Sequence, residues 1–342
     1  MLDSIRLDGA FRIAVDGVCF ATFNKPHCEY CLRRTQNDKT TYFHYALVAM
    51  LVGPSGFVLP IDIEFIENTH EHGKPLSEAD DEFKKQDCEL KAFYRLTDKL
   101  KQHYPRLPIC LLLDGLYANQ NVFTICEQEQ WDYFITLQDD SLPALQKKIR
   151  ADYKQHPENR LIQQEEGKTL TYSWSSEAIQ HAFWKGSRKG QKHYLFAISC
   201  TEIQKNKKIK FSYLCNSRPN RANIKELINQ GGRQRWKIEN QGFNTLKNHG
   251  MELEHGFGIT GNCLQNYFLL RLIALVIEQL MLHSNIFRKL QAETSKSELI
   301  HAACIKFFRS MRNLASQLLA SLRLERISLP DISKWRVYFN SS

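Results

Sequence analysis

The order in which apolar segments of different periodicity follow one another constrains this fold more than any other feature of the sequence. Three segments that mix β-branched and aromatic residues come first, at residues 11–22, 41–52 and 57–66. A Gly-Pro-Ser-Gly turn at residues 53–56 separates the second from the third, and two apolar segments joined by such a turn form a hairpin. We therefore expect three consecutive strands.

The next segment changes to a helical period. Over residues 77–104, apolar side chains recur at steps of three, four or seven residues, the stripe of an amphipathic helix, which Pro105 ends. A short and wholly apolar segment at 107–113 then predicts a strand that is covered on both faces. A short helix over about 119–130 and a strand over 131–137 complete the order strand, strand, strand, helix, strand, helix, strand.

The rest of the chain divides into an extended part and a helical part. Residues 142–220 hold alternating segments separated by Gly and Lys, which predicts an inserted antiparallel sheet. From Arg221 to about Arg323 the pattern is helical, with a break at residues 231–232, where two glycines adjoin. We expect an α/β protein with a mixed sheet, helices on both of its faces, an inserted antiparallel β subdomain and a C-terminal helical segment. The expected parts are 1–141 and 221–290 for the two halves of the α/β domain, 142–220 for the insertion and 291–342 for the C-terminal segment and tail.

The positive charge is concentrated in one stretch. The chain has a net charge of +9, and residues 201–250 hold eleven Lys and Arg against three Glu. Such a concentration suits a polyanion, because each neutralised phosphate releases condensed counterions. A solvated basic helix face explains the charge equally well, so charge alone leaves both interpretations open.

The cysteines and the termini indicate the compartment. The ten cysteines lack the dense, even spacing of a secreted disulfide scaffold, and residues 1–11 lack the features of a signal peptide. The most apolar stretch, residues 267–282, is interrupted by Arg271, Glu278 and Gln279, so we interpret it as a buried helix rather than a membrane span. We expect a reduced, cytoplasmic protein that does not enter a membrane.

Two aspartates lie in apolar strand segments. Asp16 is in the middle of the first predicted strand and Asp114 ends the fourth. The three-strand, helix, strand, helix, strand order resembles the ribonuclease H-like fold, in which these two strands are neighbours. An acid in an apolar strand is costly unless something pairs with it, and a divalent cation would pair with both. Each aspartate also precedes a glycine, so two turn-forming Asp-Gly pairs are the alternative.

A stretch farther along favours the cation. Residues 233–250, RQRWKIENQGFNTLKNHG, resemble the insertion-sequence DDE transposases whose third acid lies in a Tyr-Arg-Glu-Lys signature. Here the acid is Glu239, and Arg235 precedes it by four residues, on the same face of a helix. The resemblance extends to LLLDGLYANQ around Asp114 and to KQDCELKAFYRL at residues 85–96, and covers about residues 10–285.

The resemblance implies a ribonuclease H-like catalytic domain whose catalytic and metal-binding residues are Asp16, Asp114 and Glu239. In that family the three acids hold two Mg²⁺ ions, for which Mn²⁺ can substitute, and these ions cut transposon ends and join them to target DNA. We expect four side chains to bind DNA, and these are Arg233, Arg235, Lys237 and Lys247.

Two positions depart from the signature. Its tyrosine falls on Gly232, and its lysine is displaced from Leu246 to Lys247, eight residues after the acid. In a regular helix that lysine would lie some 80° away from the acid. A π-bulge, eased by Gly242, would absorb the extra residue and restore the alignment.

The family also implies partners. Its members carry an N-terminal domain that reads the transposon ends, whereas here the first acid is already residue 16. We therefore expect a separate end-binding polypeptide, a homodimer in the DNA complex and a bacterial, nucleoid-associated location. The alternatives are an inactive remnant that only binds DNA and a ribonuclease H-like nuclease outside transposition.

Weaker signals leave alternatives open. Cys28 and Cys31 form a Cys-x-x-Cys pair that needs two more ligands to hold zinc, and the candidates are Cys19, His44, His70 and Cys88. We expect Trp236 to face the core, and Trp174 and Trp184 to stack on bases. His255 supports the metal ligands, contacts DNA or packs within the protein. The acids Asp62, Glu64 and Glu67 either reach the metal site or are solvated.

Overall fold

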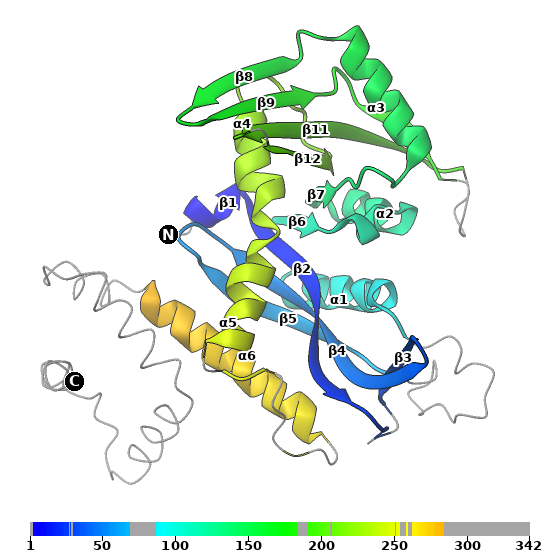
Figure 1. Cartoon of the computed structure of the whole chain (residues 1–342), viewed down its shortest axis with the longest axis vertical. Coiled ribbons are helices and arrows are strands. Elements are labelled where there is room, and N and C mark those ends of the chain that lie inside the picture. Colours follow the sequence, from blue (N-terminus) through cyan, green and yellow to red (C-terminus); the bar gives the residue numbers. More distant parts are fainter. Residues whose placement is uncertain are drawn as a thin grey trace, which may run out of the picture.

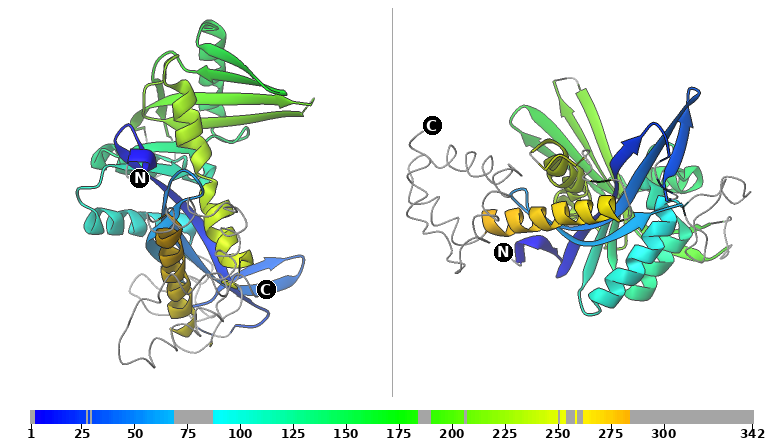
Figure 2. Two further views of the ribbon diagram at one scale, coloured as in Figure 1. Left: turned by 90° about the vertical axis from the view of Figure 1, so that its left-hand side faces the viewer. Right: turned by 90° about the horizontal axis from the view of Figure 1, so that it is seen from below.

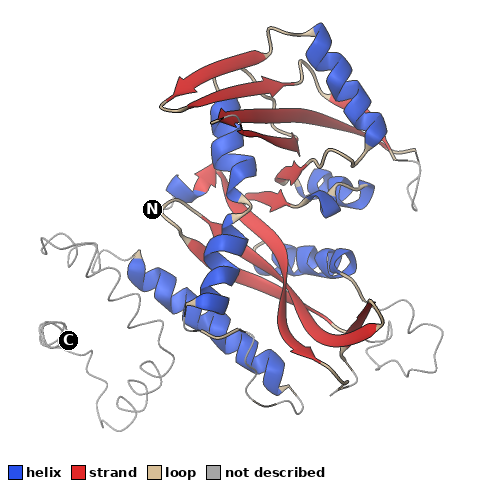
Figure 3. Ribbon diagram, viewed as in Figure 1, coloured by secondary structure: helices blue, strands red, loops and turns tan. Residues whose placement is uncertain are grey.

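The computed structural model describes residues 3–26, 28, 30–68, 87–183, 190–205, 207–249, 251–253, 258 and 262–283. Within these residues the chain forms one mixed sheet of twelve strands, flanked by helices (Figures 1 and 3). The expectation of an α/β protein with a mixed sheet is confirmed.

The first half of the sheet follows the predicted order of strands and helices. Its principal strands are β2 (Ala10–Phe23), β4 (Lys39–Val52), β5 (Val58–Ile66), β6 (Ile109–Leu113) and β7 (Asp132–Thr136). Strands β2, β4 and β5 pair antiparallel, whereas β6 pairs parallel to both β2 and β7. The spatial order is therefore β5-β4-β2-β6-β7. All five residues of β6 are buried, as its wholly apolar sequence predicts.

Helices cover both faces of this sheet, and a separate apolar core fills each side. One core packs the sheet against α1 (Glu89–His103), α2 (Gln120–Glu129) and α3 (Pro143–Gln155). The other core packs the opposite face against residues 224–249 and 251–253 and against helix α6 (Cys263–Leu282) (Figure 2). Alternation of side chains along each strand produces this arrangement, since successive residues face opposite sides.

The insertion extends the sheet instead of building one of its own. It contains β8 (Arg160–Glu165), β9 (Lys168–Trp174), β10 (Ile179–Ala182), β11 (Lys192–Gln204) and β12 (Lys207–Cys215). Strand β12 pairs antiparallel with β7, from Tyr213 opposite Thr136 to Cys215 opposite Phe134. The predicted antiparallel strands are present, and their pairing satisfies the backbone groups along the edge of β7.

Residues 224–248 form an irregular helix that runs across successive strands of the sheet, from β9 and β11 past β7 to β2 and β4 (Figure 1). Its successive segments are α4 (Ile224–Glu226), π-helix η4 (Leu227–Gly231), 3-10 helix η5 (Gly232–Gln234), π-helix η6 (Ile238–Phe243) and α5 (Asn244–Asn248). The predicted break at Gly231 and Gly232 coincides with the change from π to 3-10 geometry. A Cβ at Gly232 would lie 2.6 Å from the Tyr213 ring, so glycine allows the helix to approach β12 closely.

Three elements differ from the sequence expectations. Helix α3 lies in residues 142–220, where only extended segments were predicted, and its buried Leu145 and Ile149 have the four-residue spacing of a helix. Strand β3 (Leu32–Gln36) was not predicted, because its sequence is mostly polar and four of its five residues are exposed at the sheet edge. The helix expected over 77–104 is described from Glu89, and Ser77 lies outside the described residues.

Helix α6 is only partly buried. Phe268, Leu272 and Leu275 pack in the core, while Leu270 is 59% and Ile273 54% exposed, so the expectation of a buried helix was wrong for that face. By length and composition alone, α6 is apolar enough to cross a membrane. Its polar side chains instead have partners inside the protein: the Arg271 guanidinium donates to the Leu253 carbonyl at 3.0 Å.

Candidate active site

Strand register brings the two predicted aspartates level with each other. Strands β2 and β6 pair in parallel from Phe11 opposite Ile109 to Ala14 opposite Leu112. Two residues beyond the last pair, the same register places Asp16 opposite Asp114. Both side chains follow the parity of Ala14 and Leu112, whose side chains lie in the core beneath the irregular helix. The two acids therefore start from adjacent backbone positions on the same face.

The irregular helix brings the third acid to this face. The Arg235 Nη1 atom donates to Asp16 Oδ2 at 3.1 Å and to Glu239 Oε1 at 2.6 Å. One guanidinium nitrogen thus bridges two carboxylates that are 223 residues apart in the chain. The Arg235 and Asp16 side chains are 18% and 17% exposed, so this ion pair is largely screened from water, while Glu239 is 48% exposed.

The crowding of these acids perturbs their titration. Burial, with the hydrogen bond to Glu239, raises the pKa of Asp16 to about 7, although Arg235 opposes the shift. Partial burial works against ionisation of Glu239 as well, but hydrogen bonds from Asp16 and Arg235 hold its pKa below the ordinary value. Without a cation, the pair is therefore most stable when Asp16 carries the proton and Glu239 the charge.

Asp114 lies at the start of a short 3-10 helix, η3 (Gly115–Tyr117), and its Oδ1 accepts the Leu116 amide at 3.3 Å. The charge of Asp114 also acts on Arg235. Burial lowers the pKa of Arg235, but the hydrogen bond to Glu239 and the charges of Glu239, Asp16 and Asp114 raise it overall. Arg235 is thus the cation that the three predicted acids share.

A fourth carboxylate, Glu89, joins the group and was missed at the sequence level. It is the first residue of α1, and its Oε1 accepts the Tyr117 hydroxyl at 2.7 Å. Burial raises the pKa of Glu89, and the charge of Asp114 adds to the effect. The charges of Glu89 and Asp16, added to burial, also raise the pKa of Tyr45. Glu89 lies within the segment KQDCELKAFYRL that carries the family resemblance, which is the signal that could have identified it.

An open pocket of about 540 Å³ adjoins the acids. Asp16 and Glu239 contribute to its wall, and so does Lys247, which is exposed. The predicted π-bulge is confirmed, because residues Ile238–Phe243 form a π-helix that includes Gly242. The extra residue in this turn carries Lys247 round to the pocket that Glu239 lines. A Cβ at Gly242 would lie 2.7 Å from the Met50 sulfur, so glycine lets the π-helix pack against β4.

The other three predicted DNA-binding residues do not line this pocket. Arg235 bridges Asp16 and Glu239, as described above. Arg233 donates to Glu202 at 3.2 Å and stacks over the Phe211 ring at 4.4 Å. Lys237 donates to the Gly53 carbonyl, and burial lowers its pKa to about 8. All three side chains are therefore engaged by the protein itself.

Two assignments of tryptophan were wrong. Trp236 is 51% exposed instead of core-facing, because the 3-10 and π geometry around it changes which residues point toward the sheet. Trp174 is 5% exposed and packs in the core, so it is not available to stack on bases. Trp184 and His255 lie outside the described residues.

Asp62 and Glu64 lie within β5 and Glu67 directly follows it, and all three acids form ion pairs or hydrogen bonds with the flanking helices. Asp62 accepts from His103 at 2.7 Å, Glu64 pairs with Arg95 and Lys99, and Glu67 accepts from the Gln265 amide. None of the three acids lines the open pocket next to Asp16.

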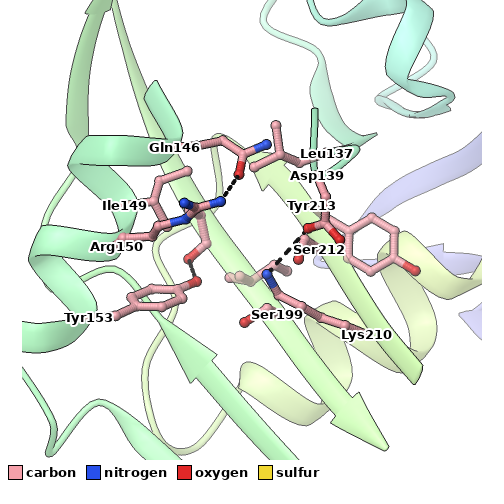
Figure 4. Close-up of a pocket in the computed structure, with 12 residues that line it drawn as sticks. Leu137, Asp139, Gln146, Ile149, Arg150, Tyr153, Ser199, Lys210, Ser212 and Tyr213 are labelled. Atoms are coloured by element: carbon pink, nitrogen blue, oxygen red, sulfur yellow. Dashed lines mark hydrogen bonds and ion pairs between the residues drawn. The ribbon is translucent and has the colours of Figure 1, made fainter. Parts of the chain in front are cut away.

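A second, smaller pocket of about 50 Å³ lies between α3 and strands β11 and β12 (Figure 4). Its polar groups satisfy one another, since Arg150 donates to Gln146 at 3.2 Å and Lys210 pairs with Asp139 at 3.6 Å. It contains none of the predicted site residues.

Comparison with known proteins gives no further assignment. No protein-family model matches the chain, and no curated protein matches its sequence.

Proposed function

We propose that this protein is the catalytic part of a DDE-type DNA transposase, with a ribonuclease H-like fold and a two-metal phosphoryl-transfer site. The observation that carries the proposal is the meeting of Asp16, Asp114 and Glu239 around Arg235. The strand order β5-β4-β2-β6-β7, with β2, β6 and β7 parallel, supports the ribonuclease H-like assignment.

The donor set suits magnesium. Mg²⁺ prefers oxygen ligands and takes few of them from protein, and Asp16, Asp114 and Glu239 offer three carboxylates around Arg235. Two of them, Asp16 and Glu239, line the open pocket. When bound there, Mg²⁺ supplies a Lewis acid for activation of a water or a 3′-hydroxyl and for stabilisation of the leaving oxygen. In the absence of a cation, Arg235 balances the charge of Glu239 and donates to Asp16.

The remaining residues of the pocket position DNA. Lys247 lines the same pocket as Glu239 and carries a charge suited to a backbone phosphate. Asn240 and Asn244, on the same helix, add amide donors to the wall. The pocket is open, as a polymeric substrate requires, and it lies where the irregular helix crosses β2 and β4. We further propose that a separate polypeptide supplies the recognition of transposon ends.

The test is cleavage of supercoiled plasmid with Mg²⁺ or Mn²⁺, alone and with candidate end-binding partners. Glu239→Gln keeps the shape of the side chain and removes its charge, so we expect nicking to fall at least 100-fold while DNA binding is retained. Glu177→Gln is the matched control, because Glu177 is 74% exposed and follows β9, which lies four strands away from β6 in the sheet. Equal cleavage by wild type and Glu239→Gln would refute the assignment of the third acid. Absence of any cleavage by the assembled wild type would favour the DNA-binding remnant.

A ribonuclease H-like nuclease is the second candidate, and Glu89 favours it. A fourth carboxylate near Asp114 enlarges the set of oxygen donors without adding a group for binding a DNA end. The two functions differ in the nucleophile. A transposase joins an added 3′-hydroxyl oligonucleotide to plasmid DNA, whereas a nuclease yields only hydrolysed products with the same DNA.

A further inference from the structure

A second cluster of metal-ligating side chains lies at the far end of β2 and β4. It consists of Cys28 and Cys31, in the connection between β2 and β3, and His44 of β4. The two sulfurs are 3.6 Å apart, and His44 Nε2 lies 3.4 Å from the Cys28 sulfur and 3.6 Å from that of Cys31. All three donor atoms therefore face one point.

These distances match a tetrahedral zinc centre. Zn–S bonds of about 2.3 Å and Zn–N bonds of about 2.0 Å at tetrahedral angles place two sulfurs about 3.8 Å apart and a sulfur about 3.5 Å from a nitrogen. Each observed distance is within 0.2 Å of that expectation. A disulfide would instead bring the sulfurs to about 2.0 Å, far closer than the 3.6 Å that separates them here.

The strand pairing explains why distant residues meet here. Leu32 of β3 pairs antiparallel with Phe43 of β4, so the next position of the same register places Cys31 opposite His44. The register of β2 shifts between Cys19 and Ala21, and the shift places Ala21 opposite His44. Cys31 and His44 are buried, at 4% and 3% exposure, which holds their donor atoms in place without a ligand.

We propose that Cys28, Cys31 and His44 bind a structural Zn²⁺ ion that fastens the β2–β3 connection to the end of β4. Two thiolates and one imidazole favour zinc over magnesium, which prefers oxygen. The site is separate from the acids: Asp16 pairs with Val48, four residues from His44 along β4, or about 13 Å. The fourth position of the tetrahedron takes a water or another ligand. The proposal is independent of the phosphoryl-transfer function.

The test is the zinc content of the full chain, measured by elemental mass spectrometry after expression with ZnCl₂ and dialysis. We expect about one zinc ion per wild-type chain, and loss of it in Cys28→Ser. Cys88→Ser and Cys19→Ser are matched controls that should retain zinc, since Cys88 is exposed and Cys19 contacts Thr22 instead of the cluster.

A second measurement keeps the proposal testable if Cys28→Ser does not fold. Cobalt added to metal-free wild type should give the intense visible bands of tetrahedral Co²⁺ and thiolate charge-transfer absorption, which ZnCl₂ then abolishes. Absence of these bands, zinc retained by Cys28→Ser, or a Cys28–Cys31 disulfide in protein purified without oxidant would each overturn the proposal.

Discussion

Ionised Asp16 destabilises the metal-free protein, and replacing it with asparagine should make that protein more stable. Its pKa lies at about 7 in the folded protein against an ordinary 3.8, because the carboxylate is desolvated and faces Glu239. One pKa unit corresponds to about 1.4 kcal/mol, so ionised Asp16 costs the folded state about 4 kcal/mol. Its side chain is only 17% exposed, so solvent screening reduces this figure little.

The sign of the pH dependence follows from the raised pKa. Below pH 3.8 Asp16 is protonated in both the folded and the unfolded chain and costs nothing. As the pH rises toward 7, the unfolded chain loses this proton first, so the stability of the wild type falls. Asp16→Asn lacks this dependence. We expect it to exceed the wild type by about 4 kcal/mol at pH 8 and by about 2 kcal/mol at pH 5.

Urea denaturation in EDTA at the two pH values measures this difference. At pH 8 the midpoint of Asp16→Asn should exceed that of the wild type by roughly 1 M or more. Asp139→Asn, an exposed control, should change stability by less than about 0.5 kcal/mol. If Asp16→Asn is less stable than the wild type at pH 8, the reasoning about a crowded carboxylate is wrong. Millimolar Mg²⁺ should then stabilise the wild type and leave Asp16→Asn unchanged, which tests the metal site separately.

Two further predictions concern the surface and the irregular helix. Lys207 and Lys208 are exposed on β12, and we expect their replacement by glutamate to weaken DNA binding equally for all DNA sequences. The salt dependence of the binding constant should fall by about two phosphate contacts. Fluorescence anisotropy at several salt concentrations measures both effects. Salt-independent binding would exclude this surface. Gly242→Ala should destabilise the protein by about 1–3 kcal/mol in urea, because its Cβ would meet the buried Met50 sulfur at 2.7 Å; an unchanged midpoint would mean that the π-helix tolerates a side chain.

The sequence predicted the strands that carry apolar alternation or wholly apolar segments. The first strand was expected at 11–22 and spans Ala10–Phe23, and the buried ICLLL segment forms β6 within the expected 107–113. Strand β3 was missed because LRRTQ is polar and joins the sheet only at an edge, where pairing needs no apolar face. The predicted strands are therefore those with a buried apolar face, because burial produces the apolar patterns from which a strand is predicted.

Side-chain partners that depend on register could not be predicted in the same way. The cysteine pair was visible in the sequence, but His44 was one of four candidate ligands until the bulge in β2 and the pairing of β3 placed it. Glu89 was likewise hidden, since nothing local indicates that the first turn of α1 faces Tyr117 and Asp114. Both depend on contacts between elements that are distant in sequence.

The irregular helix has one feature that was predicted before the structure was known and one that was not. A regular helix would place Lys247 and Glu239 on different faces, so the family resemblance, with its lysine displaced by one residue, led to the prediction of a π-turn. The structure has this turn at Ile238–Phe243, and Gly242 is the residue that allows it to pack against Met50. The same irregularity turned Trp236 outward, against expectation. A local departure from the helical period therefore aligned the acid with the pocket lysine, and it also made the facing of neighbouring residues unpredictable from a regular period.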